Sequence, residues 1–166
     1  MIEIIKARSD ADLTVVKTLI YEFIEWLHQR YPEMRAEIEY YFSNQGFDKE
    51  MADLLATYGP PSGECLLAKL QGEPAGILML KPRGQAVCEM NRMFVRASAR
   101  RNGVGVALGQ RLIKVAKSAG YKEMILSALD NHHESLPLYE KLGFRYEERA
   151  PDSGNAEREL NMRLVL

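Results

Sequence analysis

A cluster of arginines and glycines in the middle of the chain has the composition of an anion-binding turn. The segment is Arg100-Arg101-Asn102-Gly103-Val104-Gly105, and it stands between an apolar stretch that ends at Val95 and a long amphipathic stretch. Apolar residues recur at helical spacing after Gly103, which predicts a helix that begins at the glycines. The start of a helix presents unpaired N–H groups and a partial positive charge, and glycine lets a bulky anion approach closely. The segment therefore predicts a phosphate cradle.

Two common nucleotide-binding motifs do not fit this turn. A Walker loop would place a lysine and a hydroxyl residue after Gly105, and neither is present. A dinucleotide-binding G-x-G-x-x-G would need a third glycine where Leu108 stands. A nucleotide-binding protein therefore remains an alternative whose motifs are missing.

A second motif lies further along the chain. Asn131 precedes the run Leu138-Tyr139-Glu140-Lys141-Leu142-Gly143-Phe144. Together with Arg100-x-x-Gly103-x-Gly105 after a strand that ends at Val95, this order resembles the GNAT superfamily of acyl-CoA-dependent N-acyltransferases. The pattern of that family after its fourth strand is V-x-P-x-x-R-G-x-G-x-G, and its later signature is N followed by L-Y-x-x-x-G-F. The resemblance is strong over about residues 89–144 and compatible in strand order over the whole chain.

The chain departs from the family pattern in three ways. Ala97 stands where the family has proline, and Arg101 stands where it has the first glycine of the turn. The interval between Asn131 and Tyr139 is one residue longer than is common. A cradle built from backbone groups tolerates the first two changes, and the run that ends in Gly143-Phe144 sets the register of Tyr139.

The resemblance implies that the chain binds acetyl-CoA as a co-substrate. Backbone N–H groups of residues 101–106 would hold the pyrophosphate, with charge added by Arg100 and Arg101. The pantetheine arm would lie beside the end of the preceding strand, where the sheet splays and a bulge at Asn91-Arg92 is compatible with the broken alternation. The implied cofactor-binding residues are Met93, Phe94, Val95, Arg100, Arg101, Asn102, Gly103, Val104, Gly105, Val106 and Asn131.

Transfer of an acyl group to an amine needs a deprotonated nucleophile, a stabilised oxyanion and a proton for the leaving thiolate. A main-chain N–H near Phe94 or Val95 is the candidate for the oxyanion. Tyr139 could protonate the sulfur, and Glu89 could accept the proton of the amine, directly or through water. In purely structural roles, Tyr139 would pack on the sheet and Glu89 would pair with an arginine such as Arg92.

No metal site is expected. His132-His133-Glu134 lies in one polar loop without a third ligand at a recognisable spacing, so a surface loop is the better interpretation. Cys65 and Cys88 lie in apolar, strand-like stretches without metal-ligand spacing, which predicts two buried thiols.

Composition limits the class of protein. The 166 residues include 22 basic and 23 acidic side chains, with a net charge of -1, so we expect no general attraction to nucleic acid or to an anionic membrane. The longest apolar run, at residues 75–80, is too short to span a bilayer, and the N-terminus lacks a signal-peptide pattern. We expect a single domain over residues 1–166 in the cytoplasm, and a homodimer is the commonest assembly to expect.

The expected fold is α/β: a mixed, mainly antiparallel, centrally splayed sheet of about seven strands flanked by helices. Ser9 could cap a first helix that Pro32 stops, and Pro137 is tolerable only in the first turn of a late one. Strands are expected at residues 2–8, 64–70, 74–81, 86–95, 122–128, 144–149 and 157–166. Helices are expected at residues 13–30, 36–42, 49–58, 104–119 and 134–142.

The sequence thus predicts an N-acetyltransferase that moves an acetyl group from acetyl-CoA to a primary amine of a small molecule or peptide. A non-catalytic acyl-CoA-binding module is the alternative. Residues 31–63 carry no readable motif for the acceptor, although their aromatic side chains could line a pocket or belong to the core. Their acidic side chains could favour a cationic acceptor, and solvated helix faces explain them equally well. These are Glu33, Glu37, Glu39, Asp48, Glu50 and Asp53.

Overall fold

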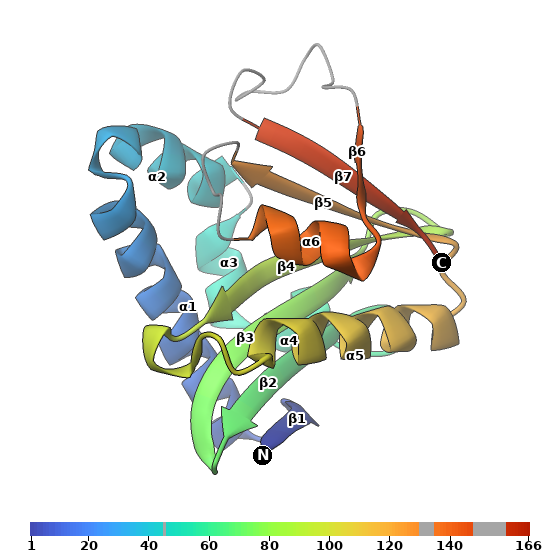
Figure 1. Cartoon of the computed structure of the whole chain (residues 1–166), viewed down its shortest axis with the longest axis horizontal. Coiled ribbons are helices and arrows are strands. Elements are labelled where there is room, and N and C mark those ends of the chain that lie inside the picture. The colour runs from blue at the N-terminus through green and yellow to red at the C-terminus, as the bar shows by residue number, and fades with distance from the viewer. Residues whose placement is uncertain (45, 130–134, 148–158) are drawn as a thin grey trace.

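One mixed sheet organises the part of the chain that the structure describes. The structure is a computed structural model, and it describes residues 1–44, 46–129, 135–147 and 159–166. Seven described strands lie in the order β1-β2-β3-β4-β5-β7-β6 (Figure 1). The strands are β1 (Ile2–Lys6), β2 (Glu64–Leu70), β3 (Glu73–Pro82), β4 (Val87–Val95), β5 (Glu123–Leu129), β6 (Arg145–Glu147) and β7 (Glu159–Val165). Only β4 and β5 pair in parallel within this described sheet, which confirms the mixed, mainly antiparallel architecture.

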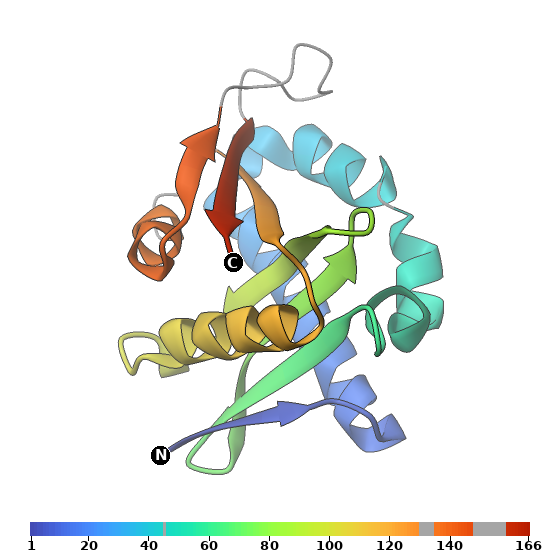
Figure 2. The same cartoon turned by 90° about the vertical axis from the view of Figure 1, so that its right-hand side faces the viewer.

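Helices cover both faces of the sheet. The described helices are α1 (Asp10–Arg30), α2 (Arg35–Asn44), α3 (Phe47–Ala52), α4 (Leu54–Tyr58), α5 (Val104–Ser118) and α6 (Leu136–Leu142). Helix α5 packs on one face, and α1 and α4 pack on the other (Figures 1 and 2). Strand β3 faces both layers, because Leu78 and Leu80 point toward α5 while Ile77 and Met79 point toward α1 and α4. The near-continuous apolar run of this strand is therefore explained by burial on both sides.

Local signals place the ends of α1. The Ser9 hydroxyl accepts the N–H of Asp12 at 3.1 Å, as the capping pattern predicts. The helix ends at Arg30, and Pro32 opens a short 3-10 turn instead of continuing it. No helix in the described ranges is long and apolar enough to cross a membrane, and the cytoplasmic location stays a prediction.

The segment from residue 35 to residue 58 contains one helix more than expected. A single helix was predicted over residues 49–58, but the chain leaves the helical conformation at Asp53, whose φ is -151°. The Asp53 side chain accepts the N–H of Ala56 at 3.2 Å and so caps α4. An aspartate that satisfies a free backbone N–H at a helix start competes well with helix continuation, which explains the break.

The sheet splays between β4 and β5, as predicted. The two strands pair at only three positions, the last of which joins Glu89 to Ile125. Beyond that point β4 bulges: its register with β3 shifts between Ile77 and Met79, and Arg92 adopts a left-handed φ of 60°. The bulge predicted at Asn91-Arg92 is therefore confirmed. Within the described residues, one edge of the second half of β4 has no partner strand.

A buried ion pair anchors this bulge to the helical layer. The Arg92 guanidinium donates Nε to Glu50 Oε2 at 3.2 Å and Nη2 to Glu50 Oε1 at 3.1 Å. Tyr58 donates its hydroxyl to the same carboxylate at 2.5 Å. Side-chain exposure is 1% for Arg92 and 4% for Glu50. Since both charges are out of water, each depends on the other for compensation.

We predict that Glu50→Gln strongly destabilises the fold. Removing one partner of a buried ion pair leaves an uncompensated charge, which costs about 3–5 kcal/mol. Urea unfolding measures this free energy directly. Asp48→Asn on the same helix is the control, because Asp48 is exposed and should change stability by no more than about 0.5 kcal/mol. A loss below about 1 kcal/mol for Glu50→Gln would contradict the anchoring role.

Candidate active site

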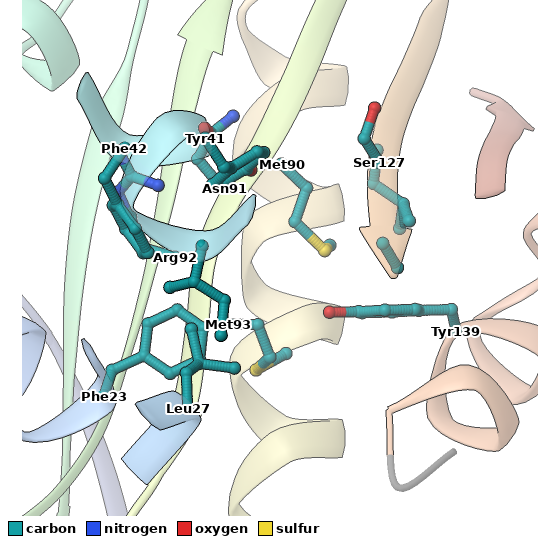
Figure 3. A pocket seen from close by; sticks show the side chains of 13 residues that line it. Phe23, Leu27, Tyr41, Phe42, Met90, Asn91, Arg92, Met93, Ser127 and Tyr139 are labelled. Atoms are coloured by element: carbon teal, nitrogen blue, oxygen red, sulfur yellow. The ribbon is translucent and has the colours of Figure 1, made fainter. Parts of the chain in front are cut away.

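A compact cavity occupies the gap where β4 and β5 separate. Its volume is about 80 Å³. Figure 3 shows its walls coming from β4, β5, α1, α2 and α6. The lining residues are Phe23, Leu27, Ile38, Tyr41, Phe42, Met90, Asn91, Arg92, Met93, Leu126, Ser127, Ala128 and Tyr139. The splay of the sheet therefore creates a largely apolar chamber beside the bulge.

Tyr139 projects from α6 into this chamber. Figure 3 shows its ring reaching in from the α6 side with the hydroxyl directed toward β4. Pro137 occupies the first turn of the helix and Gly143 ends it with a φ of 106°, both as predicted. The ring packs edge-on against Phe144 at 6.2 Å between centroids. The short helix α6, its end at Gly143 and the contact with Phe144 together direct the Tyr139 side chain into the cavity.

The Tyr139 hydroxyl is protonated at neutral pH. Burial raises its pKa above the ordinary value of 10.0, and a hydrogen bond involving Ser135 opposes the shift. Burial has this effect because the charged phenolate is disfavoured away from water. The group therefore holds a proton inside the cavity.

A larger groove adjoins the cavity at the start of α5. Its volume is about 550 Å³. The lining residues are Phe23, Trp26, Met93, Phe94, Val95, Ala99, Arg100, Arg101, Gly103, Val104, Gly105, Val106, Ser135 and Leu138. Phe23 and Met93 line both the groove and the cavity. The two spaces therefore meet at β4.

The backbone at the start of α5 fits a bound phosphate. The first intrahelical bond runs from Ala107 N to Gly103 O, so the N–H groups of residues 104–106 have no partner within the helix. A Cβ on Gly105 would lie 3.0 Å from Leu138 Cδ2. Glycine therefore permits the close approach of α5 and α6 at the groove while it keeps the cradle open.

The predicted cofactor-binding residues do not all face the groove. Arg101 lines it and is exposed, with a left-handed φ of 65° at the position where the family pattern has glycine. Arg100 lines it too, but donates Nε to Val95 O at 3.0 Å and stacks over the Trp26 ring at 4.8 Å. Asn102 is not among the lining residues, and its side-chain amide donates to two loop carbonyls. Arg101 is therefore the better placed of the two arginines to add charge.

Glu89 lies at the base of the splay and outside the cavity lining. Its exposure is 8%, and its carboxylate lies 3.5 Å from Lys81 Nζ and 3.8 Å from Arg83 Nη1. The expected alternative partner, Arg92, is bound to Glu50 instead. The role of Glu89 as a base stays a prediction.

Several cavity residues were not singled out from the sequence. Asn91 and Arg92 were noted only for the broken strand pattern, while Tyr41 and Phe42 belong to the aromatic segment whose role was left open. Of the described acidic side chains in that segment, Glu50 alone is buried, and none of them lines the cavity. The cavity therefore offers no carboxylate from this segment that would bind a cationic acceptor. Asn131 and the His132-His133-Glu134 loop lie outside the described residues.

The described residues contain two further features that bear on chemistry. Cys65 and Cys88 are free and buried, as predicted, and burial raises the pKa of each thiol to about 12. No three histidine, cysteine or acidic side chains come together there in a way that could hold a metal ion.

Comparisons with known proteins agree with this geometry. Residues 20–144 match the family model described as the acetyltransferase (GNAT) family. An uncharacterized N-acetyltransferase of Schizosaccharomyces pombe is 31% identical over 136 residues, which cover 81% of this chain and 77% of that protein. N-acetylaspartate synthetase of Danio rerio is 37% identical over 98 residues, which cover 58% of this chain and 35% of the synthetase. The chain thus matches about a third of the synthetase's length.

A solved structure shares the whole fold. The PaiA N-acetyltransferase of Thermoplasma acidophilum, in complex with coenzyme A, superposes with a TM-score of 0.76 at 19% identity, covering 100% of this chain and 99% of that one. At this identity the likeness shows the fold.

We predict that Arg101→Gly keeps the backbone conformation of the cradle and removes the charge of Arg101. A non-glycine residue in the left-handed region costs about 1–2 kcal/mol, so the glycine variant should be as stable as the wild type or more stable. Its affinity for acetyl-CoA should fall a few-fold at low salt, since one exposed cation is lost, and the difference should shrink as salt is added. Calorimetric titration at two ionic strengths measures this.

Arg101→Lys is the matched control, because it keeps the charge and should keep most of the affinity. Wild-type affinity in Arg101→Gly would show that Arg101 does not contact the phosphates.

Proposed function

The chain belongs to the GNAT acetyltransferase family and is an acyl-CoA-dependent N-acetyltransferase, and we propose that it moves an acetyl group from acetyl-CoA to a primary amine by direct attack on the thioester. One observation carries the proposal. The groove at the start of α5 meets the cavity that holds the Tyr139 hydroxyl, and Met93 lines both. A cofactor in the groove would therefore present its reactive end beside Tyr139.

The groove supplies the groups that hold the cofactor. The free N–H groups at the start of α5 would bind the pyrophosphate, with Arg101 adding charge. The unpaired edge of β4 would bind the amides of the pantetheine arm as a neighbouring strand does. When bound, acetyl-CoA supplies the activated acetyl group.

The main chain of β4 offers a donor for the oxyanion. Arg96 donates its N–H to Ala75 O on β3 at 2.8 Å. N–H groups alternate in direction along a strand, so the N–H of Val95 points away from β3, toward the open side of the splay. Val95 is therefore a better candidate than Phe94 for stabilising the negative charge that develops on the carbonyl oxygen.

Two side chains would handle the protons. Tyr139 would give its proton to the departing sulfur, since burial keeps the hydroxyl protonated until that moment. Among the described residues, no side chain that lines the cavity is a carboxylate or an imidazole. The amine proton would therefore leave through water. Glu89, which lies on β4, is the carboxylate that would receive it.

We predict that acetyl-CoA binds the protein and that an amine releases its thiol. Equimolar acetyl-CoA should raise the melting temperature, because a ligand that binds only the folded state stabilises it. Free thiol should then accumulate across a panel of primary amines. The proposal would be overturned if acetyl-CoA gave no binding heat and no rise in melting temperature. Binding without any thiol release would favour a non-catalytic acyl-CoA-binding module.

We predict that Tyr139→Phe lowers kcat by about a hundredfold, the scale of general acid catalysis, with little change in acetyl-CoA affinity. The phenyl ring keeps the packing against Phe144 while the proton is removed. Steady-state kinetics and calorimetric titration test the two halves of this prediction. Unchanged turnover in Tyr139→Phe would contradict the role of Tyr139 as the general acid.

The pH profile gives an independent readout of the same residue. Because burial raises the pKa of Tyr139 above 10.0, the wild-type kcat should not fall through loss of this proton between pH 7 and about pH 10. The control for Tyr139→Phe is Tyr146→Phe. Tyr146 is exposed and donates its hydroxyl to Glu140 outside the cavity, so this variant should turn over at the wild-type rate.

A further inference from the structure

Four consecutive residues of β4, Met90 to Met93, line the cavity. In a regular strand, neighbouring side chains point to opposite faces of the sheet. Here the register shift and the left-handed conformation of Arg92 break that alternation at the splay. Asn91 and Arg92 can therefore present polar groups to the same chamber.

Asn91 carries a buried polar atom that lacks a partner. The residue is 6% exposed, and its Oδ1 has no hydrogen-bond partner in the part of the chain that the structure describes. A buried amide left unpaired costs free energy, and such groups are normally satisfied. The O and N positions of an amide interchange by a simple flip. The Asn91 amide is thus available to donate to or accept from a molecule in the cavity.

Arg92 lines the cavity while its counter-ion does not. Glu50 binds Nε and Nη2 of the guanidinium and is absent from the lining residues. These two bonds use two of the five N–H donors of the guanidinium, which is stacked on the Phe42 ring at 4.6 Å. The chamber therefore faces an immobilised cation whose remaining donors suit an anionic oxygen.

The rest of the chamber is uncharged. Apart from Asn91, Arg92 and Ser127, the described lining residues are aliphatic, aromatic or thioether side chains, of which Tyr41 and Tyr139 carry hydroxyls. Ser127 already lies 2.9 Å from Asn161 in a side-chain hydrogen bond. An additional ammonium group of an acceptor would find no counter-charge on these walls and would lose its hydration.

The polar groups and the reacting group lie at opposite ends. Figure 3 shows Asn91 and Arg92 on the β4 and α2 side of the cavity and Tyr139 entering from the other side. Met90 and Met93 lie between them. A molecule that reacts beside Tyr139 would therefore place its far end against Asn91 and Arg92.

We infer that the acceptor is an aminocarboxylate with a compact apolar body, whose carboxylate binds Arg92 and Asn91 while its amine reaches the thioester beside Tyr139. This assignment rests on the proposed acetyl transfer. In that step the amine nitrogen forms a C–N bond to the acetyl carbon and the C–S bond breaks. The thiolate takes the proton of Tyr139, and the proton of the amine passes through water to Glu89. Solvent then takes this proton from Glu89 and returns one to the Tyr139 hydroxyl.

Three amines that differ only in the group remote from the amine test the inference. They are para-(aminomethyl)benzoate, benzylamine and para-xylylenediamine, which end in a carboxylate, a hydrogen atom and a second aminomethyl group. The value of kcat/KM, measured by thiol release, should be about tenfold or more higher for the carboxylate than for benzylamine, and lowest for the diamine. This ratio corresponds to one charge-assisted hydrogen bond.

Asn91→Asp provides the matched variant, since it keeps the Glu50–Arg92 pair and places a like charge beside the acceptor carboxylate. The preference for para-(aminomethyl)benzoate over benzylamine should fall to near unity in this variant. An unaltered preference would overturn the placement of the carboxylate at Asn91 and Arg92.

The outcomes separate the inference from the function on which it rests. Equal turnover of the carboxylate and benzylamine, or highest turnover of the diamine, would overturn the inference and leave acetyl transfer intact. Acetyl-CoA binding without thiol release from any of the amines would overturn the proposed function and, with it, the inference.

Discussion

The early end of hydrogen bonding between β4 and β5 is the constraint on which the rest of the site depends. Pairing stops at Glu89 and Ile125, so the second half of β4 has one open edge in the part of the chain that the structure describes. Backbone groups at such an edge need another partner. The same separation opens the chamber that receives Tyr139 from α6. The open edge of β4 and the cavity are thus two consequences of one break in the sheet.

The bulge beside that break requires support because Arg92 adopts a left-handed conformation. Its buried pairing with Glu50, reinforced by Tyr58, ties β4 to α3 and α4. This contact gives the helical segment before β2 a role that its own sequence does not reveal. It also sets the character of the chamber, since it places a cation in the wall with its counter-ion outside the lining.

Close packing between α5 and α6 brings the two halves of the site together. Gly105 faces Leu138, and a Cβ on Gly109 would lie 2.4 Å from Leu142 Cδ1. Both glycines therefore allow the helix that carries the phosphate cradle to approach the helix that carries Tyr139. A displacement of α6 would move the Tyr139 hydroxyl away from the junction of groove and cavity, so the position of this hydroxyl depends on the packing of Gly105 and Gly109 against α6.

The sequence by itself determined most of the elements and the glycine turn at the start of α5, because these depend on local signals. Ser9 capping, the stop at Pro32 and the glycines before α5 each act over a few residues. The polar wall of the cavity was decided by tertiary structure. Glu50 and Arg92 are 42 residues apart, and neither carries a local pattern that names the other. Burial drives their pairing, so only the folded chain shows which charges line the chamber and which are neutralised behind it.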